Sequence, residues 1–74
     1  LEWYDLQPGS DLIGETLESA DIGSRTGFSI VAIQRGDATI DSPPADTTLS
    51  EGDTLIGVGT RENCAAFEGM LAGE

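Results

Sequence analysis

The sequence predicts a small α+β domain of the order β-α-β-β-β-α, in which helices pack against one mixed sheet. Two patterns lead to this expectation. Apolar residues recur at helical spacing near residues 12–20 and again near 64–71. Short apolar runs bounded by Gly, Pro and Asp, which are typical of strands, make up most of the rest. Because 38% of the 74 residues are apolar and lie in periodic blocks, we expect one folded domain over residues 1–74 rather than a disordered chain.

The first two elements are expected to be a strand and a helix. The run Glu2–Leu6 has the alternation of a short strand and is stopped by a Pro-Gly pair. Ser10 or Asp11 is a candidate N-cap for a helix that reaches about Ala20. The apolar face of this helix consists of Leu12, Ile13, Leu17 and Ala20.

Three further strands follow. Phe28–Ile33 is nearly continuous in apolar residues, which is typical of a central strand covered on both faces. The next four residues have turn chemistry, so Ala38–Asp41 should return beside this strand as a hairpin. After a proline-bearing loop over 42–50, the turn Glu51–Asp53 introduces a strand over Thr54–Val58.

A C-terminal helix completes the domain, with Thr60 as its expected N-cap. Its apolar stripe consists of Cys64, Phe67, Met70 and Leu71. A single core in so small a domain rarely supplies more than about 3–5 kcal/mol. One cysteine and no histidine support neither an internal disulfide nor a zinc site. We therefore expect a homodimer.

Charge is the most unusual property of the composition. Fourteen carboxylates face three arginines and no lysine, for a formal net charge of -11. So acidic a domain repels nucleic acid and anionic lipid, and its self-repulsion weakens in strong salt. These properties favour a halophilic organism, an archaeon, whose cytoplasm is itself salty. Calcium binding is the alternative, but the acids are dispersed and no EF-hand loop occurs, so no metal site is expected.

Enzymatic interpretations have little support in the sequence. Without histidine, acid-base chemistry would fall to carboxylates, and neither phosphate-binding glycine pattern is present. No apolar run approaches the roughly 18 residues of a membrane span, so direct membrane insertion is not expected. The chain opens at Leu1 without a methionine, so we expect a piece of a longer polypeptide whose membrane or nucleotide-binding part lies upstream.

A series of motifs covers most of the chain, from about residue 9 to residue 60. It comprises Gly14 with Thr16-Leu17, Asp21-Ile22, Gly27, Val31–Ile33 with Arg35, Pro44, Asp46, Leu49, Gly52-Asp53, Leu55 and Gly59. In this order and spacing the sequence resembles the TrkA-C or RCK-C family. These are C-terminal regulatory domains of potassium channels, Trk- and Ktr-type uptake systems and cation/proton antiporters. The opening Glu2-Trp3-Tyr4 is similar to members that accompany the antiporters.

The resemblance implies a cytoplasmic domain that follows a nucleotide-binding or membrane part, pairs with its own copy and binds a small ligand at the dimer interface. Cyclic di-AMP is the best known ligand, and its binding segment has the pattern Asp-x-Arg followed by Asn and an aliphatic residue. Asp21 and Ile30 match this pattern, whereas Gly23 replaces the arginine and Ser29 the asparagine. A phosphate diester favours a guanidinium and an adenine favours an amide, so both departures count against cyclic di-AMP unless Arg25 substitutes.

The candidate ligand-binding residues are Asp21, Ile22, Arg25, Ser29, Ile30, Arg35 and Pro44. The candidate dimer-interface residues are Trp3, Tyr4, Ile13 and Leu17. The function indicated is a ligand-sensing regulatory domain that gates an attached channel or antiporter, and the alternative is a structural dimerisation module with no ligand site. Structural roles also stay open for single residues: Gly52 and Asp53 for the turn alone, and Arg35 for a solvated ion pair.

Overall fold

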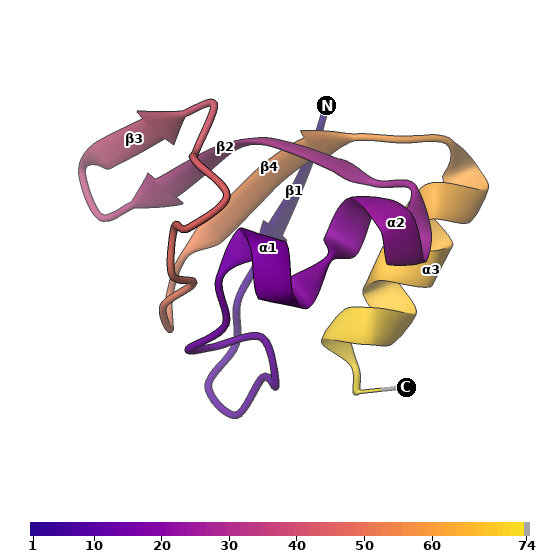
Figure 1. The fold of residues 1–74 in the computed structure, drawn as a ribbon, viewed down its shortest axis with the longest axis horizontal. Coiled ribbons are helices and arrows are strands. Elements are labelled where there is room, and N and C mark those ends of the chain that lie inside the picture. The colour runs from indigo at the N-terminus through magenta and orange to yellow at the C-terminus, as the bar shows by residue number, and fades with distance from the viewer. Residues whose placement is uncertain (74) are drawn as a thin grey trace.

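Four strands form one sheet, and helices cover one of its faces (Figure 1). The computed structural model describes residues 1–73. The elements in chain order are β1 (Glu2–Asp5), α1 (Leu17–Ala20), α2 (Ile22–Thr26), β2 (Ser29–Arg35), β3 (Ala38–Asp41), β4 (Thr54–Val58) and α3 (Arg61–Leu71). The predicted α+β class and the order of the predicted strands are confirmed, with one more short helix than expected.

The sheet is antiparallel throughout, with the strand order β1-β4-β2-β3. The expectation of a mixed sheet is therefore wrong. Strands β1 and β2, which are joined by the helical crossover, both run antiparallel to β4 and hence in the same direction. They do not pair, because β4 lies between them. Strands β3 and β4 also run in the same direction and are separated by β2, so each neighbouring pair of strands in the sheet is antiparallel.

The predicted helix from Ser10 or Asp11 to Ala20 is wrong up to residue 16. Gly14 has a φ of +92°, which lies outside the right-handed helical region, and residues 11–14 form turns. Helix α1 begins only after Thr16, whose side chain accepts from the Ser19 N–H at 3.0 Å in a capping box. Asp21, with a φ of +52°, separates α1 from the unpredicted helix α2.

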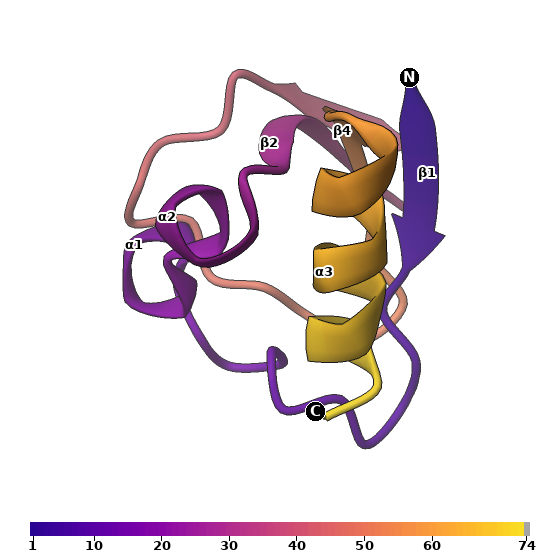
Figure 2. The ribbon, with the colours of Figure 1, turned by 90° about the vertical axis from the view of Figure 1, so that its right-hand side faces the viewer.

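Helices α1 to α3 lie on the same side of the sheet. In Figure 2, α3 lies between β1 and the α1–α2 pair. The predicted apolar stripe of α3 faces the sheet, since Phe67 and Met70 are buried and Cys64 and Leu71 pack against the core. The helix begins as expected after Thr60, which forms a capping box with Asn63.

Strand β2 is covered on one face only, contrary to the expectation of burial on both. Ile33 is fully buried, whereas Val31 is 39% exposed. The pairing with β4 shifts between Ile30 and Ala32, so that Val31 is the extra residue of a bulge. The continuous apolar run thus reflects a bulge and an open sheet face, not a second layer of helices.

An aromatic cluster forms the centre of the core. The rings of Phe28 and Phe67 stack with centroids 4.9 Å apart, and Tyr4 packs edge-on against both at 5.5 and 5.2 Å. Other fully buried side chains surround this cluster: Leu6, Ile33, Leu49 and Leu55. Over residues 1–73, no helix has both the length and the apolar character that a membrane crossing requires.

Candidate functional site

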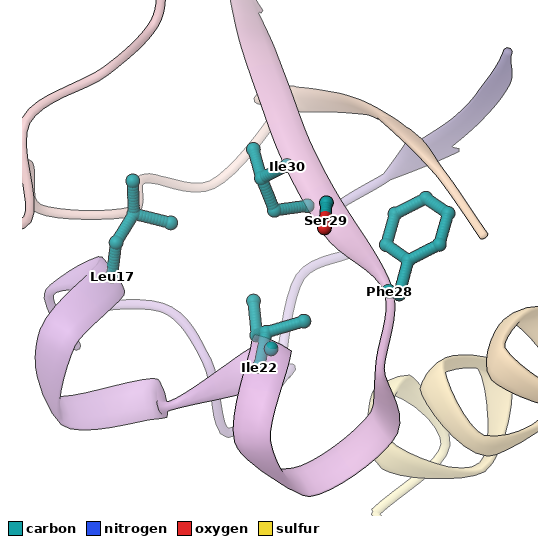
Figure 3. Close-up of a pocket in the computed structure, with 6 residues that line it drawn as sticks. Leu17, Ile22, Phe28, Ser29 and Ile30 are labelled. Carbon is teal, nitrogen blue, oxygen red and sulfur yellow. The ribbon is translucent and has the colours of Figure 1, made fainter.

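A pocket of about 250 Å³ opens between α1, α2 and the start of β2. Its lining residues are Leu17, Ile22, Gly23, Phe28, Ser29 and Ile30. Figure 3 shows the side chains of Leu17, Ile22 and Ile30 converging on the space between α1 and β2. The walls are mainly aliphatic, and Ser29, which pairs in register with Val58, is the lining residue with a polar side chain.

Three of the sequence-predicted ligand residues come together in this pocket, namely Ile22, Ser29 and Ile30. They converge because α2 ends at Gly27, whose φ of +81° turns the chain back into β2. Asp21 lies at the junction of α1 and α2, exposed and outside the lining. Gly23, where the family pattern has arginine, lies in the lining with open space around its missing Cβ.

Arg25 is placed on another side of α2, away from the pocket it was expected to serve. Its Nη1 donates to the Ala20 carbonyl at 3.4 Å. It lines a separate cavity of about 170 Å³ that Asp11 and Glu15 also line. The helical turn that brings Ile22 and Gly23 into the pocket directs Arg25 elsewhere, so the arginine of the family pattern has no substitute among the lining residues.

Arg35 is also separate from the pocket, at the opposite end of β2. Its guanidinium binds Asp53 through two hydrogen bonds of 2.8 and 2.7 Å. The Asp53 side chain is 1% exposed and the Arg35 side chain is 42% exposed, so this is a half-buried pair rather than a solvated one. Arg35 donates as well to the Thr48 carbonyl at 2.9 Å. These bonds fix the loop before β4, which gives Arg35 a structural role.

The ion pair changes the pKa of both members. Hydrogen bonds from Arg35, aided by the Ser50 N–H, hold the pKa of Asp53 below its usual range against the opposing effect of burial. The same bonds raise the pKa of Arg35. Asp53 therefore remains ionised in the protein interior. The expectation that Gly52 and Asp53 serve the turn alone is wrong for Asp53, because its carboxylate also binds Arg35.

The proline loop lies against α1 rather than in the pocket lining. Pro44 is exposed, and its carbonyl accepts from Thr47 N–H at 3.0 Å. Backbone bonds tie the loop to α1, from Leu17 N–H to Thr47 O at 3.1 Å and from Glu18 N–H to Ala45 O at 2.9 Å. The loop thus fixes the helix that carries one wall of the pocket.

The candidate interface residues are divided between two faces. Trp3 is 59% exposed on the face of the sheet that the helices leave open. Tyr4, Ile13 and Leu17 pack against the core from the other side. Tyr4 is a core aromatic whose hydroxyl donates to Glu68 Oε2 at 2.7 Å, and chiefly for this reason its pKa is raised. Of the four, Leu17 alone lines the main pocket.

Sequence reasoning missed two residues that shape the site. Phe28 was assigned only to a strand, yet it lines the pocket and anchors the core. Asn63 ties α3 to α2, since its Nδ2 donates to the Thr26 carbonyl at 3.0 Å. The Thr60-x-x-Asn63 spacing was the signal for the cap, but the bond to Thr26 follows only from the packing of α2 on α3. Within residues 1–73, carboxylates and the cysteine do not gather into a metal-binding group of three or more.

The family model of the TrkA-C domain matches residues 1–72, nearly the whole chain. The chain belongs to the TrkA-C family. Among the relatives, "Potassium channel protein 1" of Methanocaldococcus jannaschii is 35% identical over 63 residues, covering 85% of this chain and 19% of that protein. The ammonium/H(+) antiporter subunit AmhM of Alkalihalophilus pseudofirmus is 31% identical over 72 residues, covering 97% of this chain and 43% of the subunit. The chain therefore spans less than half the length of these relatives.

Solved TrkA-C structures share this fold. The RCK C domain of the potassium transport protein KtrA, in complex with cyclic di-AMP, has a TM-score of 0.80 at 31% identity, covering 92% of this chain and 80% of that chain. The RCK_C domain dimer of Streptococcus agalactiae BusR, also with cyclic di-AMP, has a TM-score of 0.89 at 22% identity, covering 99% of this chain and 96% of that one. The predicted family, its regulatory class and the α+β fold are confirmed.

The BusR comparison limits one expectation from the sequence. BusR has also been solved with promoter DNA, so the TrkA-C fold occurs in a DNA-binding protein as well as in transport proteins. For the present chain, the expectation that nucleic acid is not a partner rests on the net charge of -11 alone.

Proposed function

We propose that this domain is the regulatory, ligand-sensing and dimerising part of a potassium or other monovalent-cation transport protein, acting on the cytoplasmic face of the membrane on an attached channel or antiporter. Membership of the TrkA-C family, with channel and antiporter-subunit relatives, supports a regulatory rather than a catalytic role. The observation that carries the proposal is the pocket, because Ile22, Ser29 and Ile30 line it together within the segment that the family pattern assigns to the ligand.

The size of the pocket favours a site shared by two copies. One pocket holds about 250 Å³, slightly less than the roughly 300–1,000 Å³ of typical small-molecule sites. Two pockets joined across a two-fold axis would enclose about 500 Å³, which is inside that range. Leu17, half-buried at the pocket rim, would then contact the second copy. Ligand binding and dimer geometry would be coupled in this arrangement, as regulation requires.

Regulation also requires that the ligand bind one dimer arrangement more tightly than another. Cyclic di-AMP, the ligand in the KtrA complex, is the first candidate. The aliphatic walls suit an adenine ring, but the lining residues include no arginine or lysine to bind the phosphates. We therefore expect weak binding of cyclic di-AMP by the wild-type domain.

The second candidate function is a structural dimerisation module without a ligand site. The observation in its favour is that Gly23 takes the place of the arginine, while Arg25 and Arg35 are committed to Ala20 and Asp53. In that case the pocket would receive side chains of the second copy.

Thermal unfolding in molar salt tests the first candidate, with cyclic di-AMP, adenine nucleotides and divalent cations as separate additions. A ligand present at a hundred times its Kd stabilises by about 2.7 kcal/mol, which in a domain of this size raises Tm by roughly 10–20 °C. Analytical ultracentrifugation in the same salt tests the dimer that both candidates require. A folded monomer at high protein concentration would contradict both.

A double variant distinguishes the two candidates. Gly23→Arg with Ser29→Asn restores the family pattern at exposed positions, and open space surrounds the Gly23 Cβ position. If the variant binds cyclic di-AMP and the wild type does not, the wild-type chain is the structural dimerisation module. Gly23→Gln with Ser29→Asn is the matched control, because it adds bulk without the guanidinium.

A further inference from the structure

The sheet face opposite the helices carries an uncovered apolar surface. The strand register places Trp3, Ile56 and Ala32 in one row across β1, β4 and β2. Val58 follows Ile56 on the same face, since alternate residues of a strand share a face. The bulge adds Val31 next to Ala32, because Ile30 and Ile33 on either side both face the helices. We call the surface formed by Trp3, Val31, Ala32, Ile56 and Val58 the open face.

Exposed apolar area is concentrated on this surface. Trp3, Val58 and Val31 are 59%, 44% and 39% exposed. Over residues 1–73, the one other large apolar side chain with such exposure is Leu1, two residues before Trp3. The domain buries its other large apolar side chains. A group of exposed apolar side chains in one place is typical of an interaction surface.

Carboxylates flank the open face. Asp41 pairs in register with Ala32, so it continues the row of Trp3 and Ile56 onto β3. Asp5 lies two residues after Trp3 on the same face, and its carboxylate accepts from the Thr54 hydroxyl at 2.7 Å.

The three arginines belong to other parts of the domain. Arg35 turns to Asp53, Arg25 lies on α2 and Arg61 begins α3. The strands of the open face therefore offer a partner apolar and negative groups without a cationic side chain of their own.

A second copy of the chain fits this surface poorly. In a two-fold face-to-face pair, each open face would meet an identical one, which brings Asp5 and Asp41 of both copies together. Each copy also carries a net charge of -11. A segment with an apolar stripe bordered by lysine or arginine fits better, since the stripe would cover Trp3, Val31 and Val58 while its cations meet the two carboxylates.

We propose that the open face docks a cationic amphipathic segment of a partner protein. The ligand pocket lies on the helix-covered face of the sheet, so both sites can be occupied at once. The docking surface is therefore independent of the ligand function proposed above, and failure of one leaves the other intact.

Trp3 provides a direct test, because it is the single tryptophan of the chain and lies on the open face. The probe is a synthetic amphipathic helix with leucine on one side and lysine on the other, and the comparison peptide has glutamate in place of lysine. Titrations use the 74-residue chain at the lowest salt concentration at which it is folded. We expect the lysine peptide to shift Trp3 emission to shorter wavelength in a saturable manner, with an affinity that falls as salt rises. The glutamate peptide should produce no shift.

Variants separate docking on the open face from general attraction to an acidic protein. Val31→Lys should weaken binding at least tenfold, because it removes apolar area and adds a like charge. Asp41→Asn should weaken it a few-fold, whereas Glu18→Gln, which removes one charge from α1 on the other side of the sheet, should leave it unchanged. Unfolding curves of each variant verify the fold.

Three results would overturn the proposal. The first is equal binding of the lysine peptide by the wild type and Val31→Lys. The second is an equal loss of affinity in Glu18→Gln and Asp41→Asn, which would mean binding by net charge alone. The third is a shift of Trp3 emission that grows with protein concentration in the absence of peptide, because a second copy would then cover the face.

Discussion

The guanidinium of Arg35 holds the buried carboxylate of Asp53 in a two-bonded pair, Nε to Oδ1 at 2.8 Å and Nη2 to Oδ2 at 2.7 Å. The pair joins the end of β2 to the turn that begins β4, and Asp53 also accepts from the Ser50 N–H at 2.9 Å. Because the Asp53 side chain is only 1% exposed and the hydrogen bonds are charge-assisted, this pair holds β2 and the start of β4 together.

We expect Asp53→Asn to destabilise the domain at pH 7. The substitution leaves the Arg35 charge without its counterion and removes one of two charge-assisted bonds. Breaking a fully buried pair costs about 3–5 kcal/mol, but Arg35 is partly in water, so a loss of about 1–3 kcal/mol is expected. Denaturant unfolding measures it, with Asp37→Asn in the exposed β2–β3 turn as a control of equal charge change. Equal stability of the two variants would contradict the anchoring role.

The effect of Asp53→Asn should disappear in acid. The pKa of Asp53 is lower in the folded state than the ordinary value of about 3.9 that it has when unfolded. Its ionised form therefore stabilises the fold fully above about pH 4, and this contribution is lost as pH falls through the lower folded-state pKa. The free-energy difference between wild type and Asp53→Asn should shrink steadily below pH 4. A difference that stays constant down to pH 2 would mean that ionisation of Asp53 is not its source.

Asn63 connects α3 to the end of α2. Its Oδ1 accepts from the Thr60 N–H at 3.0 Å and its Nδ2 donates to the Thr26 carbonyl. Asn63→Asp keeps the cap acceptor but turns a carboxylate toward the Thr26 carbonyl, so a loss of about 1–2 kcal/mol is expected. Thr60→Ser, which retains the capping hydroxyl, is the control and should change stability little. Wild-type stability of Asn63→Asp would show that the Thr26 bond contributes nothing.

Two glycines should respond to alanine in opposite directions. A Cβ on Gly57 would collide with the Ser29 carbonyl and lie 2.6 and 2.7 Å from Phe28 ring carbons, so Gly57→Ala is expected to cost about 1–3 kcal/mol or more. Gly23 lies in α2 with open space around it, so Gly23→Ala should gain about 0.5–1 kcal/mol from helix propensity. Both values follow from thermal unfolding, and a tolerated Gly57→Ala would contradict the close packing of β4 on Phe28.

Salt should control the stability of the whole domain. A net charge of -11 on 74 residues is self-repulsive, and the Debye length falls from about 10 Å at 0.1 M salt to about 3 Å at 1 M. We expect Tm to rise by several degrees between these two concentrations of KCl, as followed by circular dichroism. A triple variant of exposed acids, Glu18→Gln, Glu51→Gln and Glu62→Gln, should show a smaller rise. A salt-independent Tm in the wild type would remove the support for a halophilic host.

The sequence determined the features that depend on neighbours along the chain. Thr60 marks the start of α3 because its hydroxyl accepts from the backbone N–H three residues later. The apolar stripe that contains Phe67 follows from helical periodicity. The Gly52-Asp53 turn and the β2–β3 hairpin follow from local backbone preferences. The ordered series of short motifs was sufficient for the family.

The tertiary structure alone decided the features that depend on distant segments. Arg35 meets Asp53 because β4 pairs with β2, and no local pattern specifies which strands are neighbours. The same insertion of β4 makes the sheet antiparallel, and the bulge at Val31 turns an apolar run toward the open face. The pocket combines Leu17 of α1 with Ser29 of β2, whereas Arg25 faces away from it. Periodicity fixes which side of an element is apolar, but strand order and register decide what that side contacts.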